Sequence, residues 1–146
     1  MTVPSVTPAI QDLYPDSFAH CYGCGRHNAL GLHVRTEWTG NAGVARFQPR
    51  PEHIAIPGFV YGGLLASLID CHAIGTAAAA AMAASGNRPG VDPSPRFVTA
   101  VLDVRFIKPT PLGPELVLRA TPTDVGARKV VVDVSLMADG VETVRG

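Results

Sequence analysis

The sequence has little charge. Only 16% of its 146 residues are Asp, Glu, Lys or Arg, whereas charged residues make up about 25% of an average soluble domain. Twelve basic residues balance twelve acidic ones, so the chain lacks the positive footprint of a protein that binds nucleic acid or an anionic membrane. Intrinsic disorder is excluded as well, because 47% of the residues are hydrophobic and disorder requires low hydrophobicity. A surface with so few charges favours self-association.

Cysteines and targeting signals are also scarce. Three cysteines are too few, and odd in number, for the disulfide framework of a small secreted protein. The first ten residues contain no basic residue and no apolar run, so they do not form a secretory signal. The apolar stretch Leu64–Ala84 is long enough to cross a membrane, but it contains Asp70 and His72, which are costly in hydrocarbon. We therefore expect a cytoplasmic protein that does not enter the membrane.

The chain length predicts one domain. Residues 1–20 are rich in proline and form an irregular arm, with a short helical turn near residues 9–14, and residues 21–146 form the domain. Alternating apolar and polar residues predict a hairpin over residues 32–48, with Gly40-Asn41 between its strands. The same alternation predicts later strands over residues 98–106, 116–118, 130–136 and 141–145.

The apolar segment that ends near Ala84 is expected to be a helix, because it is too long for a strand and rich in Leu and Ala. Ser85-Gly86-Asn87 predicts its end. The order is therefore two strands, one long helix and three or four strands, joined by turns short enough for antiparallel neighbours. One helix against an antiparallel sheet of five to six strands is an α+β fold.

The chemistry is expected near the start of this helix. Asp70 lies in an apolar segment without a nearby lysine or arginine, so it is either a solvated or capping residue or a carboxylate in a partly apolar cleft, acting as base or nucleophile. Gly62-Gly63 either permits a tight loop or leaves the first backbone N–H groups of the helix uncovered. Such N–H groups stabilise a developing oxyanion on an acyl carbonyl.

Helix geometry constrains how these two features work together. Gly62 and Asp70 are eight residues apart, which is roughly 12 Å along one helix. One carbonyl group cannot contact both at about 3 Å. If both serve one substrate, the glycine of one subunit must approach the aspartate of another at a two-fold interface.

Three segments of the sequence carry a resemblance to a known family. The run from His53 to Asp70 reads HIAIPGFVYGGLLASLID, the segment 98–108 ends in a basic residue before Pro109, and the opening run from Cys21 reads CYGCG. Together they resemble the hotdog-fold thioesterases of the phenylacetate-pathway type. The run that leads into the helix is the most specific of the three.

The resemblance implies a curved antiparallel sheet wrapped around one long helix, and dimers that join their sheets edge to edge and sometimes pair again into tetramers. It implies hydrolysis of an acyl-CoA thioester to a free acid and CoA, with the Gly62 N–H as oxyanion donor and Asp70 as base or nucleophile. Many relatives carry His where this chain has Tyr61. Tyrosine donates a hydrogen bond but has no ring nitrogen that titrates near neutral pH.

Four further residues are candidates for substrate binding. Gly63 shares the helix start, and His53 either reaches the cleft from its loop or makes a structural hydrogen bond. Arg105 and Lys108 are either partners for the phosphates of coenzyme A or solvated charges. Two alternative functions stay open: a hotdog hydratase or dehydratase, in which a histidine faces Asp70 across the interface, and a non-catalytic acyl-thioester-binding protein.

The pair Cys21-x-x-Cys24 has the spacing of a zinc or redox motif. A structural zinc site needs four ligands, and only His27 and His33, at irregular spacing, would complete it. We expect a tight turn with small buried thiols, no metal and no cofactor. His72 points about 200° away from Asp70 on a helix, so it is expected in the core or at an interface.

Overall fold

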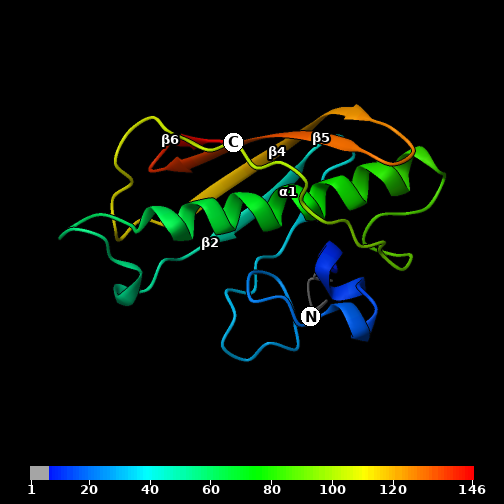
Figure 1. Ribbon diagram of the computed structural model, residues 1–146, viewed down its shortest axis with the longest axis horizontal. Helices are drawn as coiled ribbons and strands as arrows, with labels where there is room; N and C mark the ends of the chain where they lie inside the picture. Colours follow the sequence, from blue (N-terminus) through cyan, green and yellow to red (C-terminus); the bar gives the residue numbers. More distant parts are fainter. Residues whose placement is uncertain (1–6) are drawn as a thin grey trace, which may run out of the picture.

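One long helix, α1 (Gly62–Ala84), lies across a curved antiparallel sheet in the computed structural model, which describes residues 7–146 (Figure 1). The sheet has six strands in the order β1-β2-β4-β5-β6-β3. The strands are Glu37–Trp38 (β1), Gly43–Phe47 (β2), Arg105–Phe106 (β3), Leu116–Val125 (β4), Val130–Ala138 (β5) and Val141–Arg145 (β6). The predicted α+β class, with one helix and five to six strands, is confirmed.

The core forms between one side of α1 and the sheet. Leu68 is fully buried and belongs to one cluster with Leu116 and Leu118 of β4 and Leu136 of β5. The alanine run 77–80 is buried as well, since a side chain of one methyl group lets the helix backbone approach its neighbours closely. By length and hydropathy α1 would also cross a membrane, but 67% of its most apolar window is buried inside the protein, as expected for a core helix.

The end of α1 is the one that the sequence predicts. The N–H of Asn87 donates to the Met82 carbonyl at 2.9 Å, and the N–H of Gly86 donates to the Ala83 carbonyl at 3.3 Å. Gly86 has φ of 82°, a left-handed conformation that glycine adopts without steric cost. These features form a Schellman motif, which pairs the last carbonyl groups of the helix.

Most predicted strands are present, but two are shorter than predicted. The hairpin of β1 and β2 is confirmed, although its first strand has only two residues. The N–H groups of Leu32 and Val34 bond to the carbonyls of Tyr22 and Gly23 instead. The preceding loop therefore takes the place of a sheet partner for residues 32–34.

The predicted strand over residues 98–106 is wrong except at Arg105–Phe106, which pairs with β6. Within residues 7–146, the backbone of residues 98–104 forms no hydrogen bond to other backbone groups. This stretch continues β3, the last strand in the sheet order, so the same chain offers it no neighbour on its outer side. Two of its valines stay exposed, with Val98 90% and Val101 79% accessible, whereas Val104 is half-buried against the core.

The N-terminal segment packs against α1 beside the β1 edge of the sheet, below the helix in the view of Figure 1. The predicted helical turn is the 3-10 helix η1 (Ile10–Leu13), and a second turn, η2 (Asp16–Phe18), follows it. Ile10 is fully buried, and its N–H donates to the Thr36 carbonyl at 3.0 Å. The first six residues of the predicted arm lie outside the described residues, and the predicted domain boundary after residue 20 stays a prediction.

Candidate active site

The start of α1 presents backbone N–H groups without a cap. Tyr61 is the N-cap residue, in an extended conformation, and its side chain forms no capping hydrogen bond. Its carbonyl accepts from the N–H groups of Leu64 and Leu65 at 3.1 and 3.3 Å. Among the residues that the structure describes, the N–H groups of Gly62 and Gly63 have no acceptor. The positive end of the helix dipole is thus open to an incoming oxygen.

Two aromatic rings flank the glycines at the start of α1, and one of them explains Gly63. A Cβ added at Gly63 would collide with the ring of Tyr61, so the tyrosine occupies the space that glycine leaves over the first turn. A Cβ at Gly62 would lie 3.4 Å from the ring of Phe106, an ordinary contact. Tyr61 and Phe106 are 58% and 56% exposed. The free N–H groups therefore lie in a partly apolar setting that solvent still reaches.

Asp70 lies two turns further along α1 and is half-buried. The hydroxyl of Thr99 donates to its Oδ1 at 2.5 Å. In the described part of the chain no cation forms an ion pair with Asp70, and Oδ2 has no hydrogen-bond donor. One carboxylate oxygen is held in place while the other is free to accept a proton or to attack carbon.

The segment of residues 93–106 connects these features, and we call it the strap. It crosses α1 in the direction opposite to the helix (Figure 1). Thr99 of the strap contacts Asp70, and Phe106 at its end lies beside Gly62. The strap therefore lies along the same side of α1 as both predicted catalytic groups, which remain roughly 12 Å apart along the helix.

The other predicted binding residues lie around the helix start. His53 belongs to the 3-10 helix η3 (Pro51–His53), its Nδ1 accepts from the N–H of Arg50 at 2.9 Å, and its carbonyl accepts from the N–H of Tyr61 at 2.8 Å. Burial, together with the charge of Arg50, lowers the pKa of His53. The imidazole is therefore neutral and fixes the loop that leads into α1.

Arg105 and Lys108 are exposed, at the edge strand β3 and just after it. Successive side chains of a strand point to opposite faces. Since Phe106 lies against Gly62, Arg105 points away from α1. The structure thus brings His53, Tyr61, Gly62 and Gly63 together and keeps Arg105 apart from them within one chain.

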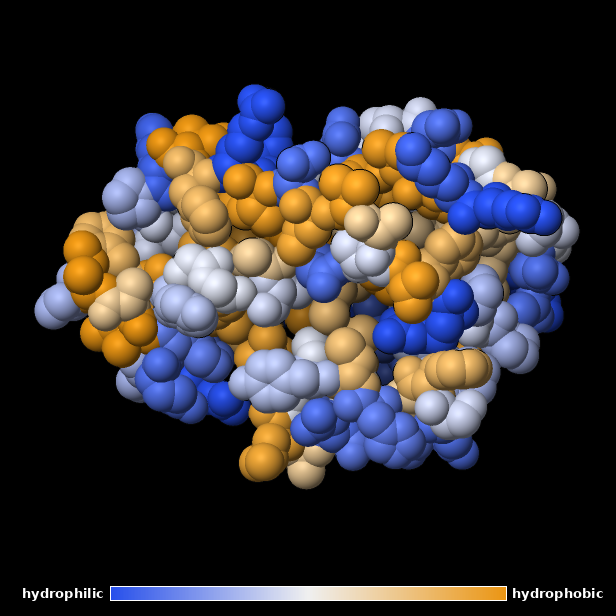
Figure 2. Space-filling view, viewed as in Figure 1, coloured by the Kyte–Doolittle hydropathy of each residue, from blue (hydrophilic) through white to orange (hydrophobic). Residues whose placement is uncertain are grey.

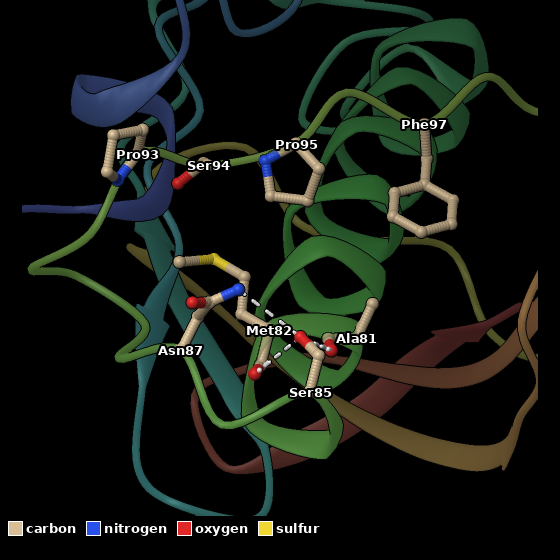
Figure 3. Close-up of a pocket in the computed structure, with 8 residues that line it drawn as sticks. All are labelled: Ala81, Met82, Ser85, Asn87, Pro93, Ser94, Pro95 and Phe97. Carbon is tan, nitrogen blue, oxygen red and sulfur yellow. Dashed lines mark hydrogen bonds between the residues drawn. The ribbon is translucent and has the colours of Figure 1, made fainter.

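A shallow pocket of about 380 Å³ lies at the other end of α1 (Figure 3). Its walls include Ala81 and Ser85 of the helix end, with Pro95 and Phe97 of the strap above them. Ala81 is eleven residues beyond Asp70, roughly 16 Å along the helix. None of the predicted site residues lines this pocket, so it is separate from the candidate active site.

His72 is a core residue, in line with the sequence. It is fully buried, with Nδ1 2.9 Å from the hydroxyl of Thr36 and Nε2 3.1 Å from the carbonyl of Gly43. Gln11 also donates to Thr36 Oγ1 at 3.0 Å. Burial lowers the pKa of His72 from 6.5 to about 4. The ring is thus neutral, donates from Nε2 to the carbonyl, and joins the N-terminal segment to α1 and β2.

Three contacts in this region were not predicted from the sequence. Thr99 reaches Asp70, Phe106 covers Gly62, and the thiol of Cys71 joins those of Cys21 and Cys24. The hydrogen bond from Cys71 lowers the pKa of Cys24, with Arg96 adding to the effect, and the same contact and burial raise the pKa of Cys71. For the thiol cluster, the sequence offered one cue, a third cysteine next to Asp70 in the helix. It offered none for the contacts of Thr99 and Phe106.

Comparison with known protein families identifies the family to which this chain belongs. Residues 57–144 match the family model described as thioesterase superfamily. The thioesterase superfamily protein from Shewanella loihica PV-4, a solved structure, is 44% identical, with 89% of this chain and 90% of that chain covered and a TM-score of 0.67. The chain belongs to the thioesterase superfamily, and the predicted hotdog fold is confirmed.

Two further solved structures share the fold at lower identity. The PaaI protein from the phenylacetic acid degradation operon of E. coli is 15% identical, with 78% of this chain and 75% of that chain covered and a TM-score of 0.63. A Streptococcus mutans UA159 protein, solved bound to acetyl CoA, is 16% identical, with 77% of this chain and 82% of that chain covered and a TM-score of 0.60. No curated protein matches the sequence.

The buried imidazole predicts a pH-dependent stability. The unfolded chain binds a proton at His72 near pH 6.5, whereas the folded protein resists protonation down to about pH 4. The free energy of unfolding should therefore fall as the pH decreases through this window, by about 3 kcal/mol from this residue. Urea denaturation of the His72→Gln variant should show a flatter pH dependence than the wild type, even if the variant is less stable throughout. Replacing the exposed His20 by Ala should leave the wild-type slope, and equal slopes for His72→Gln and wild type would contradict the assignment.

Proposed function

We propose that the protein hydrolyses an acyl-CoA thioester to a free acid and CoA. The observation that carries the proposal concerns α1 of this thioesterase superfamily chain. In the described residues, the N–H groups of Gly62 and Gly63 have no hydrogen-bond acceptor, and the half-buried Asp70 lies on the same helix. The acetyl CoA bound to the Streptococcus mutans protein of the same fold supports CoA esters as the substrate class.

The two groups divide the chemistry between them. The thioester carbonyl oxygen accepts a hydrogen bond from the Gly62 N–H, which stabilises the negative charge that develops on that oxygen. Asp70 either removes a proton from the attacking water or attacks the carbonyl carbon itself to form a mixed anhydride that water then cleaves. In both routes the C–S bond breaks and the sulfur leaves as CoA thiolate, which takes up a proton. Thr99 orients the carboxylate, and Tyr61 is placed to assist at the carbonyl.

Two copies of the chain complete the site in this proposal. Because Gly62 and Asp70 are roughly 12 Å apart along α1, one carbonyl group contacts the glycine of one protomer and the aspartate of the other. The backbone of residues 98–104 continues the edge strand β3 without partners in the described chain, and free edges of this kind pair with other chains.

Exposed apolar side chains support this contact. Figure 2 shows orange, apolar side chains at the left-hand end, where the loop before α1 lies, and across the upper middle of this face. The exposed large apolar residues near the helix start and strap include Ile56, Val98, Val101, Phe106 and Ile107. A homodimer joined edge to edge would cover them, and Arg105 of the edge strand would then lie near the interface, where phosphate groups of CoA are within its reach.

The hydratase or dehydratase alternative needs a histidine that faces Asp70. His72 has both ring nitrogens engaged in the core, and His53 Nδ1 accepts from the Arg50 N–H. Within one chain, neither histidine therefore faces Asp70. In the proposed dimer His53 would lie on the side of Gly62, so hydration of an enoyl-CoA ester, assayed beside thiol release, separates this alternative from our proposal. The remaining alternative, an acyl-thioester-binding protein without activity, is separated from our proposal by the assays below.

Replacing Asp70 tests the carboxylate. Asp70→Asn keeps the shape of the side chain and an acceptor for Thr99 but removes the basic oxygen, so kcat for thiol release from acyl-CoA esters should fall by about 100-fold or more. Thermal melting and the oligomeric state should stay those of the wild type. The matched control is Asp124→Asn at an exposed position of β4, which should keep full activity. A folded Asp70→Asn variant with wild-type kcat would refute the mechanism.

Replacing Gly62 tests the backbone donor. Proline has no N–H but fits the first helical position, and Tyr61 before it has the extended conformation that proline requires (φ −60°, ψ 127°). Gly62→Pro should therefore keep α1 and lower kcat by about 100- to 1,000-fold. Gly62→Ala retains the N–H and adds only an ordinary contact with Phe106, so it should stay within about tenfold of the wild type. Equal kcat values for the two variants would exclude the Gly62 N–H as oxyanion donor.

Mixed dimers test whether the site is shared. When Asp70→Asn and Gly62→Pro chains are co-expressed in equal amounts, half of the dimers are mixed, and each mixed dimer regains one intact site out of two. Thiol release should then reach about a quarter of the wild-type rate, although each variant alone is nearly inactive. Activity that stays at the level of the separate variants would place both groups of a site in the same chain.

A further inference from the structure

The thiol groups of all three cysteines meet on one side of α1. The Sγ atoms of Cys21, Cys24 and Cys71 lie within 4.8 Å of one another, and those of Cys21 and Cys71 are 4.0 Å apart. Cys24 and Cys71 are buried, and Cys21 is half-buried. In the described residues no other group of three such side chains would hold a metal ion. The proposed hydrolysis does not use this cluster.

The loop of residues 21–25 is built to bring its thiols to the helix. A Cβ at Gly23 would collide with the sulfur of Cys71, and a Cβ at Gly25 would collide with the backbone of Cys21 and Ala19. The N–H of Gly25 donates to the Cys21 carbonyl at 2.7 Å and closes the turn. Gly23 therefore permits the close approach of the loop to the Cys71 sulfur, and Gly25 permits the tight turn that presents Cys21 and Cys24.

The spacing of the sulfur atoms suits a tetrahedral metal ion. Three thiolates bound to one zinc ion at about 2.3 Å lie about 3.8 Å from each other. The observed separations of 4.0 Å and at most 4.8 Å reach this value by side-chain shifts of less than about 1 Å. The donors are all sulfur, with no carboxylate in the group, and such a donor set selects a soft ion such as Zn²⁺ over Mg²⁺ or Ca²⁺.

A cation next to the cluster balances the charge of such a site. Three thiolates around one Zn²⁺ carry one net negative charge, which is costly to bury without compensation. The guanidinium of Arg96 lies 3.9 Å from Cys24 Sγ and 4.5 Å from the centre of the Tyr14 ring, which holds it in place. The assembled site would thus be neutral overall.

We propose that Cys21, Cys24 and Cys71 bind one Zn²⁺ ion that joins the loop of residues 21–25 to α1. Binding transfers the thiol protons to the buffer, and a water molecule takes the fourth position on the side of the half-buried Cys21. The expectation of no metal considered only His27 and His33 as further ligands beside the two thiols of the loop, whereas the helix supplies Cys71. This site is independent of the proposed hydrolysis, although Cys71 adjoins Asp70 in sequence.

Metal binding by the reduced wild-type protein tests the proposal directly. Under anaerobic conditions the protein should bind one Zn²⁺ per chain, measured by elemental analysis and by competition with a chromophoric chelator. Co²⁺ should give the visible absorption of a tetrahedral thiolate complex, and Zn²⁺ should raise the melting temperature. Reduced wild-type protein that binds no Zn²⁺, or that binds it without a thiolate signature in the Co²⁺ spectrum, would overturn the proposal.

Variants assign the ligands. Cys21→Ser, at the least buried position, should weaken Zn²⁺ binding by more than about 100-fold. Loss of a residue that only hydrogen-bonds to a metal ligand costs less than this. The control His27→Ala removes an exposed imidazole outside the sulfur cluster and should keep wild-type affinity. If peroxide instead converts the zinc-free wild type to a Cys21–Cys71 disulfide, and added Zn²⁺ does not slow this oxidation, the cluster is a thiol pair and not a metal site.

Discussion

The rigid rise of α1 fixes the distance between the Gly62 N–H and the Asp70 carboxylate, the two groups proposed to act on the substrate. Leu68 and its neighbours hold the helix against β4 and β5, so the helix cannot bend to bring the Gly62 N–H and the Asp70 carboxylate onto one atom. The surroundings of the two groups differ. Glycines leave the donors uncovered at one end, and Thr99 holds one oxygen of the acid at the other. If both groups act on one carbonyl group, as we propose, two copies of the helix are needed in a symmetric assembly.

The same rigidity separates three consecutive side chains. Each residue of a helix turns the side chain by about 100°, so Asp70 faces the strap, Cys71 faces the loop of residues 21–25, and His72 faces Thr36 and Gly43. A carboxylate, a thiol and an imidazole that are adjacent in sequence therefore never form a catalytic group together. One short stretch of helix instead supplies the proposed catalytic carboxylate, a candidate metal ligand and a buried structural hydrogen bond.

The sequence predicted those features that depend on local pattern. Helix α1, its end at Ser85-Gly86-Asn87 and the succession of helix and strands along the chain follow from periodicity and stop signals that lie within a few residues of each other. The strand over residues 98–104 was predicted wrongly because alternation reports which side chains are apolar, not whether a neighbouring strand exists. Strand β1 begins only at Glu37 for a related reason. The backbone N–H groups of residues 32 and 34 bond to the loop of residues 22–23 and not to β2.

The site was predictable only where a motif marks it. The glycines and Asp70 stand in a recognisable run, whereas Thr99, Phe106 and the approach of Cys71 depend on how distant segments fold over α1. No spacing in the sequence links Thr99 to Asp70 across 29 residues. The assignment of catalytic roles to these residues stays a prediction.

Thr99 occupies the very stretch of chain whose backbone lacks partners. In the proposed dimer, the strand that joins the two sheets is thus also the strand that steadies the acid. An isolated protomer would keep its folded core but hold its carboxylate through a single loosely tethered hydroxyl. Dimer formation would then activate the protein, and newly made chains would not hydrolyse thioesters until they bind a second copy.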